Sequence, residues 1–69
     1  MHIYAEPNQW GSYDIYLDGV YWRRYRLDGD RVVKCSNREG IAVIRPVQAQ
    51  IEEVIWVKMK EQRDARKTA

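Results

Sequence analysis

The sequence predicts an α+β fold, in which a three- to four-stranded antiparallel meander packs one face against a long C-terminal helix. Two observations support this prediction. The first half of the chain alternates β-prone runs with Asp-Gly dipeptides at 18–19 and 28–29, a pattern typical of hairpins. After Pro46 the chain contains no Gly or Pro and repeats apolar residues at helical spacing. Its 69 residues form a single small domain, with the sheet over about 2–45 and the helix over about 46–66.

The first Asp-Gly dipeptide separates the β-prone runs 13–17 and 20–25. A two-residue type I′ turn accepts Asp-Gly because it needs positive φ at both central positions, and it fixes the register of the hairpin. In that register Ile15 lies opposite Trp22 on an apolar face, and Asp14 forms an ion pair with Arg23 on the other. The face opposite the apolar one then carries these residues: Tyr16, Tyr21, Arg23 and Tyr25.

Three further segments complete the expected sheet. A strand over 2–6 ends at Pro-Asn, a strand over 30–35 follows the second Asp-Gly, and a short strand over 41–44 follows a loop. With a two-residue loop at the second Asp-Gly, Lys34 shares the face of Tyr25. A three-residue loop with a bulge would exchange the faces of this strand, and both registers remain open.

The helix is expected to dock three turns on the sheet and to extend two turns beyond it. Pro46 suits its first position, where the missing N–H costs nothing. Its apolar residues cover an arc of about 200°: Val47, Ile51, Val54, Ile55, Val57 and Met59. Trp56 points away from the docked face, where either the loop that carries Trp10 or a partner molecule would cover it.

Charge and aromatic residues are unevenly distributed. The net charge of +2 divides into −3 over 1–22, +4 over 23–45, −2 over 46–57 and +3 over 58–69. Seven of the eight aromatic residues lie within the first 25 positions, next to the first basic segment. Basic residues beside aromatic ones are typical of nucleic-acid binding, because rings stack on bases while cations hold phosphates.

Several classes of function are not expected. The single histidine, His2, lies at the N-terminus, which argues against an enzyme. The single cysteine, Cys35, excludes an internal disulfide and a zinc cluster, and it is expected in the core rather than as a reactive thiol. No cofactor, metal site or membrane span is expected, and a reduced cytoplasmic setting fits best.

Two surfaces are candidate sites. The sheet face would bind nucleic acid, with DNA favoured over RNA, through Tyr16, Tyr21, Arg23, Tyr25 and Lys34. The C-terminal end of the helix would attract the nucleic-acid backbone electrostatically through Arg63, Arg66 and Lys67. The same sheet face would also suit a protein partner, or would only stabilise the sheet as a tyrosine ladder. The alternative is an interaction module, either a homodimer or an inhibitor of a larger protein, that uses Trp56 and Met59.

Two segments, 19–25 (Gly-Val-Tyr-Trp-Arg-Arg-Tyr) and 47–52 (Val-Gln-Ala-Gln-Ile-Glu), carry a resemblance to a known family. Together they resemble the arm-type DNA-binding domain of tyrosine recombinases, a three-stranded sheet with a C-terminal helix, and more loosely plant AP2-type domains. The resemblance covers about 13–55 and implies a free-standing relative such as a small phage or mobile-element regulator. It further implies that the sheet face enters the DNA major groove with these base-contacting residues: Tyr21, Arg23, Tyr25 and Lys34.

Overall fold

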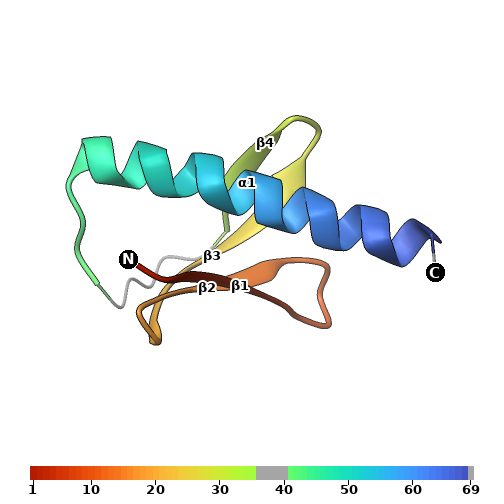
Figure 1. Cartoon of the computed structure of the whole chain (residues 1–69), viewed down its shortest axis with the longest axis horizontal. Coiled ribbons are helices and arrows are strands. Elements are labelled where there is room, and N and C mark those ends of the chain that lie inside the picture. The colour runs from red at the N-terminus through yellow and green to blue at the C-terminus, as the bar shows by residue number, and fades with distance from the viewer. Residues whose placement is uncertain (36–40, 69) are drawn as a thin grey trace.

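The computed structural model describes residues 1–35 and 41–68, with side chains through residue 65. This part of the chain contains four strands and one helix. The elements are β1 (Ile3–Pro7), β2 (Tyr13–Leu17), β3 (Val20–Asp28), β4 (Arg31–Lys34) and α1 (Arg45–Thr68). The strands form one antiparallel sheet in the order β1-β2-β3-β4, and α1 crosses one of its faces (Figure 1). The predicted α+β class is therefore confirmed. We call the sheet face opposite α1 the outer face.

The β2–β3 turn and the β3–β4 turn each have two residues. Residues 18–19 have φ angles of 51° and 84°, as a type I′ turn requires, so the predicted Asp-Gly turn is confirmed. The next loop is 29–30 rather than 28–29, because Asp28 pairs with Arg31. Only Gly29 has positive φ there, which is typical of a type II′ turn. This change moves the register by two positions, so Lys34 still shares the face of Tyr25, as the two-residue loop predicted. That face, however, is the one that packs against α1, not the predicted outer face.

A β-bulge in β3 changes which residues face α1. Tyr16 pairs with Tyr21, but Ile15 pairs with Arg23, so Trp22 is an extra residue in β3. An extra residue reverses the alternation of faces beyond it. The expected pairing of Ile15 with Trp22 is therefore wrong, and the residues after the bulge lie on the opposite face from the one predicted.

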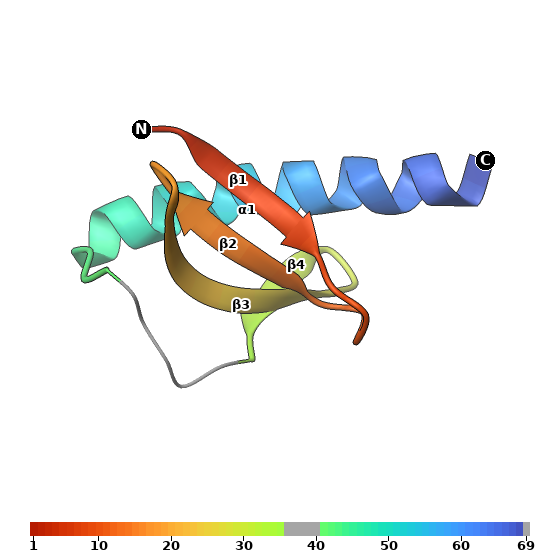
Figure 2. The ribbon, with the colours of Figure 1, turned by 90° about the horizontal axis from the view of Figure 1, so that it is seen from below.

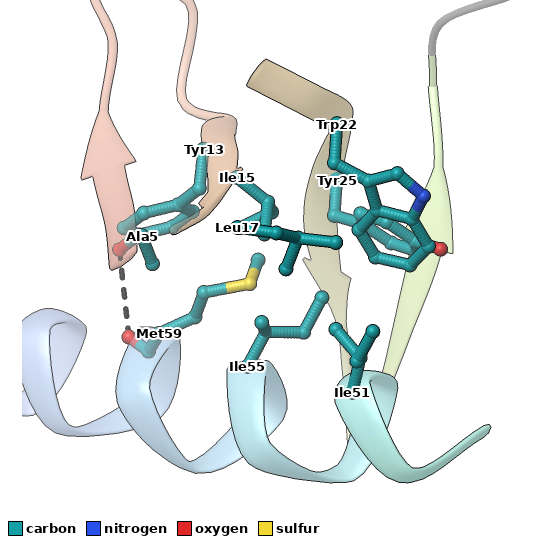
Figure 3. Packing of buried hydrophobic residues seen from close by; sticks show 9 residues of the cluster. All are labelled: Ala5, Tyr13, Ile15, Leu17, Trp22, Tyr25, Ile51, Ile55 and Met59. Carbon is teal, nitrogen blue, oxygen red and sulfur yellow. Dashed lines mark hydrogen bonds between the residues drawn. The ribbon is translucent and has the colours of Figure 1, made fainter. Parts of the chain in front are cut away.

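The core lies between the inner face of the sheet and one stripe of α1 (Figure 3). Ile51, Ile55 and Met59 are spaced by four residues and bury one side of the helix. The expected apolar arc was too wide, because Val54 and Val57 remain 40% and 45% exposed. The sheet contributes the other core residues: Ala5, Tyr13, Ile15, Leu17, Trp22 and Tyr25.

The helix contacts the sheet over more than the expected three turns. Val47, near the start of α1, packs against the core. Fifteen residues further on, the Gln62 side chain donates from Nε2 to Ala5 O in β1 at 3.0 Å. The C-terminal end of α1 then extends past the sheet, as Figure 2 shows.

Two expectations about the connection between β4 and α1 are wrong. Residues 41–44 form no strand; instead Ile41 and Val43 pack their side chains against the core. Cys35 is exposed rather than buried, because it follows the last residue of β4 at the sheet margin. The loop expected over 36–40 lies outside the described residues.

Candidate functional site

Three tyrosines from three strands form a row across the outer face, which we call the tyrosine row. Tyr4 in β1 pairs with Tyr16 in β2, which pairs with Tyr21 in β3. The ring centroids of Tyr4 and Tyr16 are 6.3 Å apart, and those of Tyr16 and Tyr21 are 5.8 Å apart. The second pair meets edge to face, a favourable geometry for aromatic rings. Tyr4 is 49% exposed, so its side chain remains available for contact.

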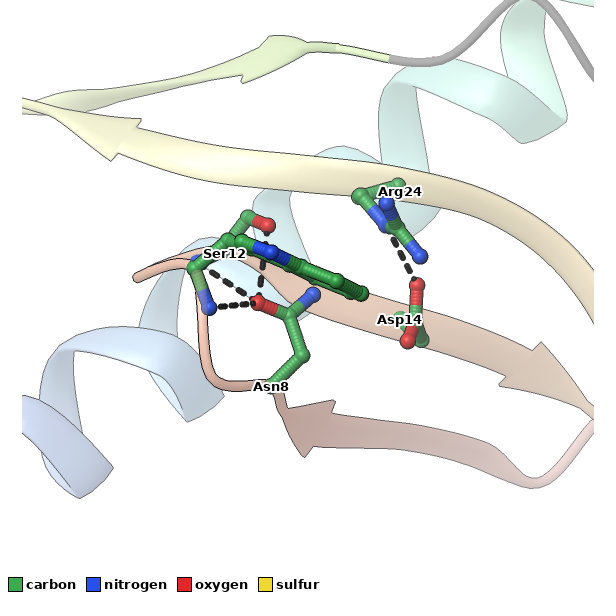
Figure 4. Close-up of polar contacts among 5 residues, drawn as sticks. Asn8, Ser12, Asp14 and Arg24 are labelled. Carbon is green, nitrogen blue, oxygen red and sulfur yellow. Dashed lines mark hydrogen bonds and ion pairs between the residues drawn. The ribbon is translucent and has the colours of Figure 1, made fainter.

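A cationic group, Arg24, lies beside the tyrosine row, three residues beyond Tyr21 in β3. Arg24 Nε forms a 2.8 Å ion pair with Asp14 Oδ1 in β2 (Figure 4). The hydrogen bond to Asp14 raises the pKa of Arg24 above its ordinary value, so the guanidinium stays charged. The alternation of β3 also brings the exposed Arg26 to the outer face. The tyrosine row therefore crosses β1, β2 and β3, and the outer-face arginines follow it further along β3.

The β1–β2 loop places an indole ring over Arg24. Asn8 Oδ1 accepts hydrogen bonds from Trp10 N at 2.9 Å, Ser12 N at 3.2 Å and Ser12 Oγ at 3.1 Å. This folded loop holds the Trp10 ring centroid 5.0 Å from the Arg24 guanidinium carbon, a cation–π distance. Trp10 is 67% exposed and packs on Arg24, so the expectation that its loop covers Trp56 is wrong.

Two residues of the predicted sheet platform are buried on the helix side because of the bulge. Tyr25 is 1% exposed, and its Oη donates to Glu52 Oε2 of α1 at 2.6 Å. Burial, and next the hydrogen bond to Glu52, raise the pKa of Tyr25. Arg23 Nη1 donates to Tyr25 Oη at 3.3 Å, and the Arg23 guanidinium carbon lies 4.7 Å from the Trp22 ring centroid. Neither side chain can meet a ligand on the outer face, and Asp14 pairs with Arg24 instead of Arg23.

Of the remaining predicted basic residues, none joins the tyrosine row among the side chains that the structure describes. Lys34 pairs with Tyr25 in the register, so its side chain leaves β4 on the helix side. Arg63 lies on α1, on the other side of the sheet, with its Nε 3.6 Å from Asp64 Oδ1. The side chains of Arg66 and Lys67 lie outside the described part.

The two residues of the predicted partner interface on α1 differ in exposure. Met59 has 0% exposure and belongs to the core, so its assignment to an interface is wrong. Trp56 is partly buried, with Lys60 Nζ 5.0 Å from its ring centroid. It lines a groove of about 640 Å³ between α1 and the β3–β4 turn. The groove residues are Asp30, Arg31, Val32, Ala49, Glu52, Glu53, Trp56 and Val57.

The predicted site therefore retains Tyr16 and Tyr21, and it missed Tyr4, Trp10, Arg24 and Arg26. Tyr4 carried a usable signal, because it alternates with Ala5 in the expected N-terminal strand. Within residues 1–35 and 41–68, no three metal-ligating side chains cluster. In the same part of the chain, no helix is long and apolar enough to span a membrane.

Comparisons with protein-family models, curated proteins and solved structures found no match to this chain. The resemblance to the recombinase arm domain therefore remains a prediction.

Proposed function

We propose that the chain is a small, non-catalytic nucleic-acid-binding protein whose outer face is the binding surface. The observation that carries this proposal is the tyrosine row beside Arg24 and Arg26, on the sheet face that α1 leaves open. Aromatic rings stack on bases of any sequence, while guanidinium groups bind phosphate oxygens. A nucleic-acid strand on the outer face would place bases on the tyrosine row and phosphates beside Arg24 and Arg26.

Trp10 and Arg24 add to this surface. The hydrogen bond from Arg24 Nε to Asp14 Oδ1 holds the charged guanidinium on the outer face, where it would attract a phosphate. The exposed Trp10 ring extends the aromatic surface towards the β1–β2 loop. These residues replace Arg23 and Tyr25, which the bulge removes from the expected platform.

The test is fluorescence anisotropy with a labelled single-stranded oligonucleotide of about ten nucleotides, within the usual site size for such surfaces. Tyr4→Ala and Arg26→Ala change exposed side chains, so both variants are expected to fold. Loss of one stacking ring is expected to weaken binding about fivefold or more. Arg45→Ala is the matched control, because it removes one exposed charge from α1 on the other side of the sheet. Undiminished binding by a folded Tyr4→Ala, Arg26→Ala double variant would contradict the proposal.

A second candidate function is self-association through the groove between α1 and the β3–β4 turn. Its walls carry three carboxylates, Asp30, Glu52 and Glu53, around the apolar side chains of Trp56 and Val57. This chemistry suits a basic segment, and the helix end 58–67 of a second copy would provide one. Light scattering tests it: a dimer that Val57→Asp dissociates would support this function, whereas a monomeric wild type would exclude it.

A further inference from the structure

A hollow adjoins the tyrosine row at the β1 edge of the outer face. It has a volume of about 440 Å³ and is lined by His2, Tyr4, Glu6, Tyr16 and Gly19. His2, Tyr4 and Glu6 occupy alternate positions of one strand segment, so their side chains share its outer side. Each is about 7 Å from the next along the strand. The hollow therefore combines aromatic rings with one carboxylate and one imidazole.

The N-terminal end of this hollow is held in place. His2 N donates to Asp18 Oδ1 at 2.7 Å, and Asp18 N donates to His2 O at 2.8 Å. These two bonds fix the start of β1 beside the β2–β3 turn. The His2 side chain is exposed next to the hollow, where it can contact a sugar or a phosphate.

Of the described residues that line the hollow, Glu6 alone is acidic, and its exposed carboxylate is available to a ligand. Among residues 1–35 and 41–65, no side chain forms an ion pair or hydrogen bond with it. An ionised carboxylate accepts hydrogen bonds through two oxygens and donates none. A matching ligand therefore presents two adjacent N–H donors in the plane of a ring that stacks on Tyr4.

Among the common bases, guanine alone has this pair of donors, N1–H and the N2 amino group, on its Watson–Crick edge. Adenine and cytosine place an acceptor nitrogen beside their amino group, and thymine and uracil place carbonyls on both sides of N3–H. In a duplex the Watson–Crick edge is occupied by the complementary base. A base that reaches Glu6 in this way must therefore be unpaired.

We propose that this hollow binds an unpaired guanine of a single-stranded nucleic acid, with the base stacked on Tyr4 and its Watson–Crick edge on Glu6. This inference rests on the proposed function and specifies its ligand. It differs from the major-groove contact that the recombinase resemblance implies, because a duplex would not offer the edge that Glu6 recognises. Single-stranded DNA and RNA both carry the base, so the two sources are compared directly.

The experiment measures binding of the full chain to oligothymidylate that contains one central guanine, hypoxanthine or adenine. Hypoxanthine lacks the 2-amino group, so it retains only one of the two donors. Guanine is expected to bind about five- to tenfold more tightly than adenine, with hypoxanthine between them. The same series in an oligouridylate background, together with a guanine-containing duplex, distinguishes RNA from DNA and single strands from duplexes.

Glu6→Gln tests the recognition itself. An amide presents one acceptor and one donor, so this variant is expected to reduce the guanine preference to less than twofold. Glu53→Gln on α1 is the matched control, because it removes the same charge from the other side of the sheet and should keep the preference. For each variant, the affinity for the guanine oligonucleotide is divided by that for the adenine oligonucleotide. Loss of a negative charge changes both affinities alike, so it cancels in this ratio.

Three results would overturn the inference and leave the proposed function intact. They are equal affinities for the three bases, a guanine preference that survives Glu6→Gln, and duplex binding as tight as single-strand binding. Absence of binding to every oligonucleotide would instead contradict the proposed function as well. Preference for guanine that depends on Glu6, in either DNA or RNA, supports the inference.

Discussion

Replacing Tyr25 with Phe removes one hydroxyl from the interior and tests the polar contact between β3 and α1. The side chain is 1% exposed, and its Oη donates to Glu52 Oε2 at 2.6 Å and accepts from Arg23 Nη1 at 3.3 Å. Hydrogen bonds to charged groups contribute about 1.5–3 kcal/mol. Because Gln48 Nε2 still donates to Glu52 in the variant, we expect the free energy of unfolding to fall by about 2 kcal/mol at pH 7.

The same substitution predicts a pH dependence. Burial and the hydrogen bond to Glu52 raise the pKa of Tyr25 above its ordinary value. The fold therefore prefers the protonated phenol, and the stabilisation is complete below pH 10 and lost as the pH rises above it. Above about pH 10 the wild type should lose stability relative to Tyr25→Phe by about 1.4 kcal/mol per pH unit.

Urea unfolding of both proteins, followed by far-UV circular dichroism at neutral and alkaline pH, measures these differences. Tyr4→Phe is the control, because it removes an exposed hydroxyl and should change stability by less than about 0.5 kcal/mol. Equal stability of wild type and Tyr25→Phe at pH 7 would refute the contact. A difference that stays constant above pH 10 would refute its pH dependence.

Three other changes have expected outcomes. Met59→Ala removes a fully buried side chain from the core. In the same urea assay it should lower the free energy of unfolding by about 3 kcal/mol, and a loss below about 1 kcal/mol would contradict the burial of Met59. Gly19→Ala should lower the free energy of unfolding by about 1 kcal/mol, because a φ of 84° strains any residue with a Cβ. An unchanged unfolding midpoint would argue against the type I′ turn. If Arg24 and Arg26 each bind one phosphate, log affinity for single strands should fall with log salt at a slope of about −1.4. A slope near zero would exclude these ion contacts.

The hairpin turn and the helix were predictable because their signals are local. Asp-Gly at 18–19 specifies positive φ within two residues, and the absence of Gly and Pro after Pro46 permits one continuous helix. The class of the fold followed from these elements. The prediction of a strand over 41–44 was wrong because a short apolar run indicates burial but not the type of structure. In this segment Ile41 and Val43 are partly buried against the core without forming a strand.

The site was harder to predict because one extra residue in β3 decides it. Without the bulge at Trp22, alternation would place Arg23 and Tyr25 outside, as expected from the turn. The bulge is favoured by tertiary packing: it buries Trp22 completely and brings the Tyr25 hydroxyl to Glu52, which lies 27 positions further along the chain. A contact over that distance has no local signature. The position of Trp10 over Arg24 likewise depends on the fold of the loop around Asn8.

A titration of the ¹⁵N-labelled protein with a guanine-containing single strand, followed by amide chemical shifts, tests the binding surface most directly. We expect the largest shifts at Tyr4, Glu6, Tyr16, Tyr21 and Arg24, with small shifts along the exposed side of α1. Shifts confined to α1 and the β3–β4 turn, or no shifts at all, would contradict nucleic-acid binding by the outer face.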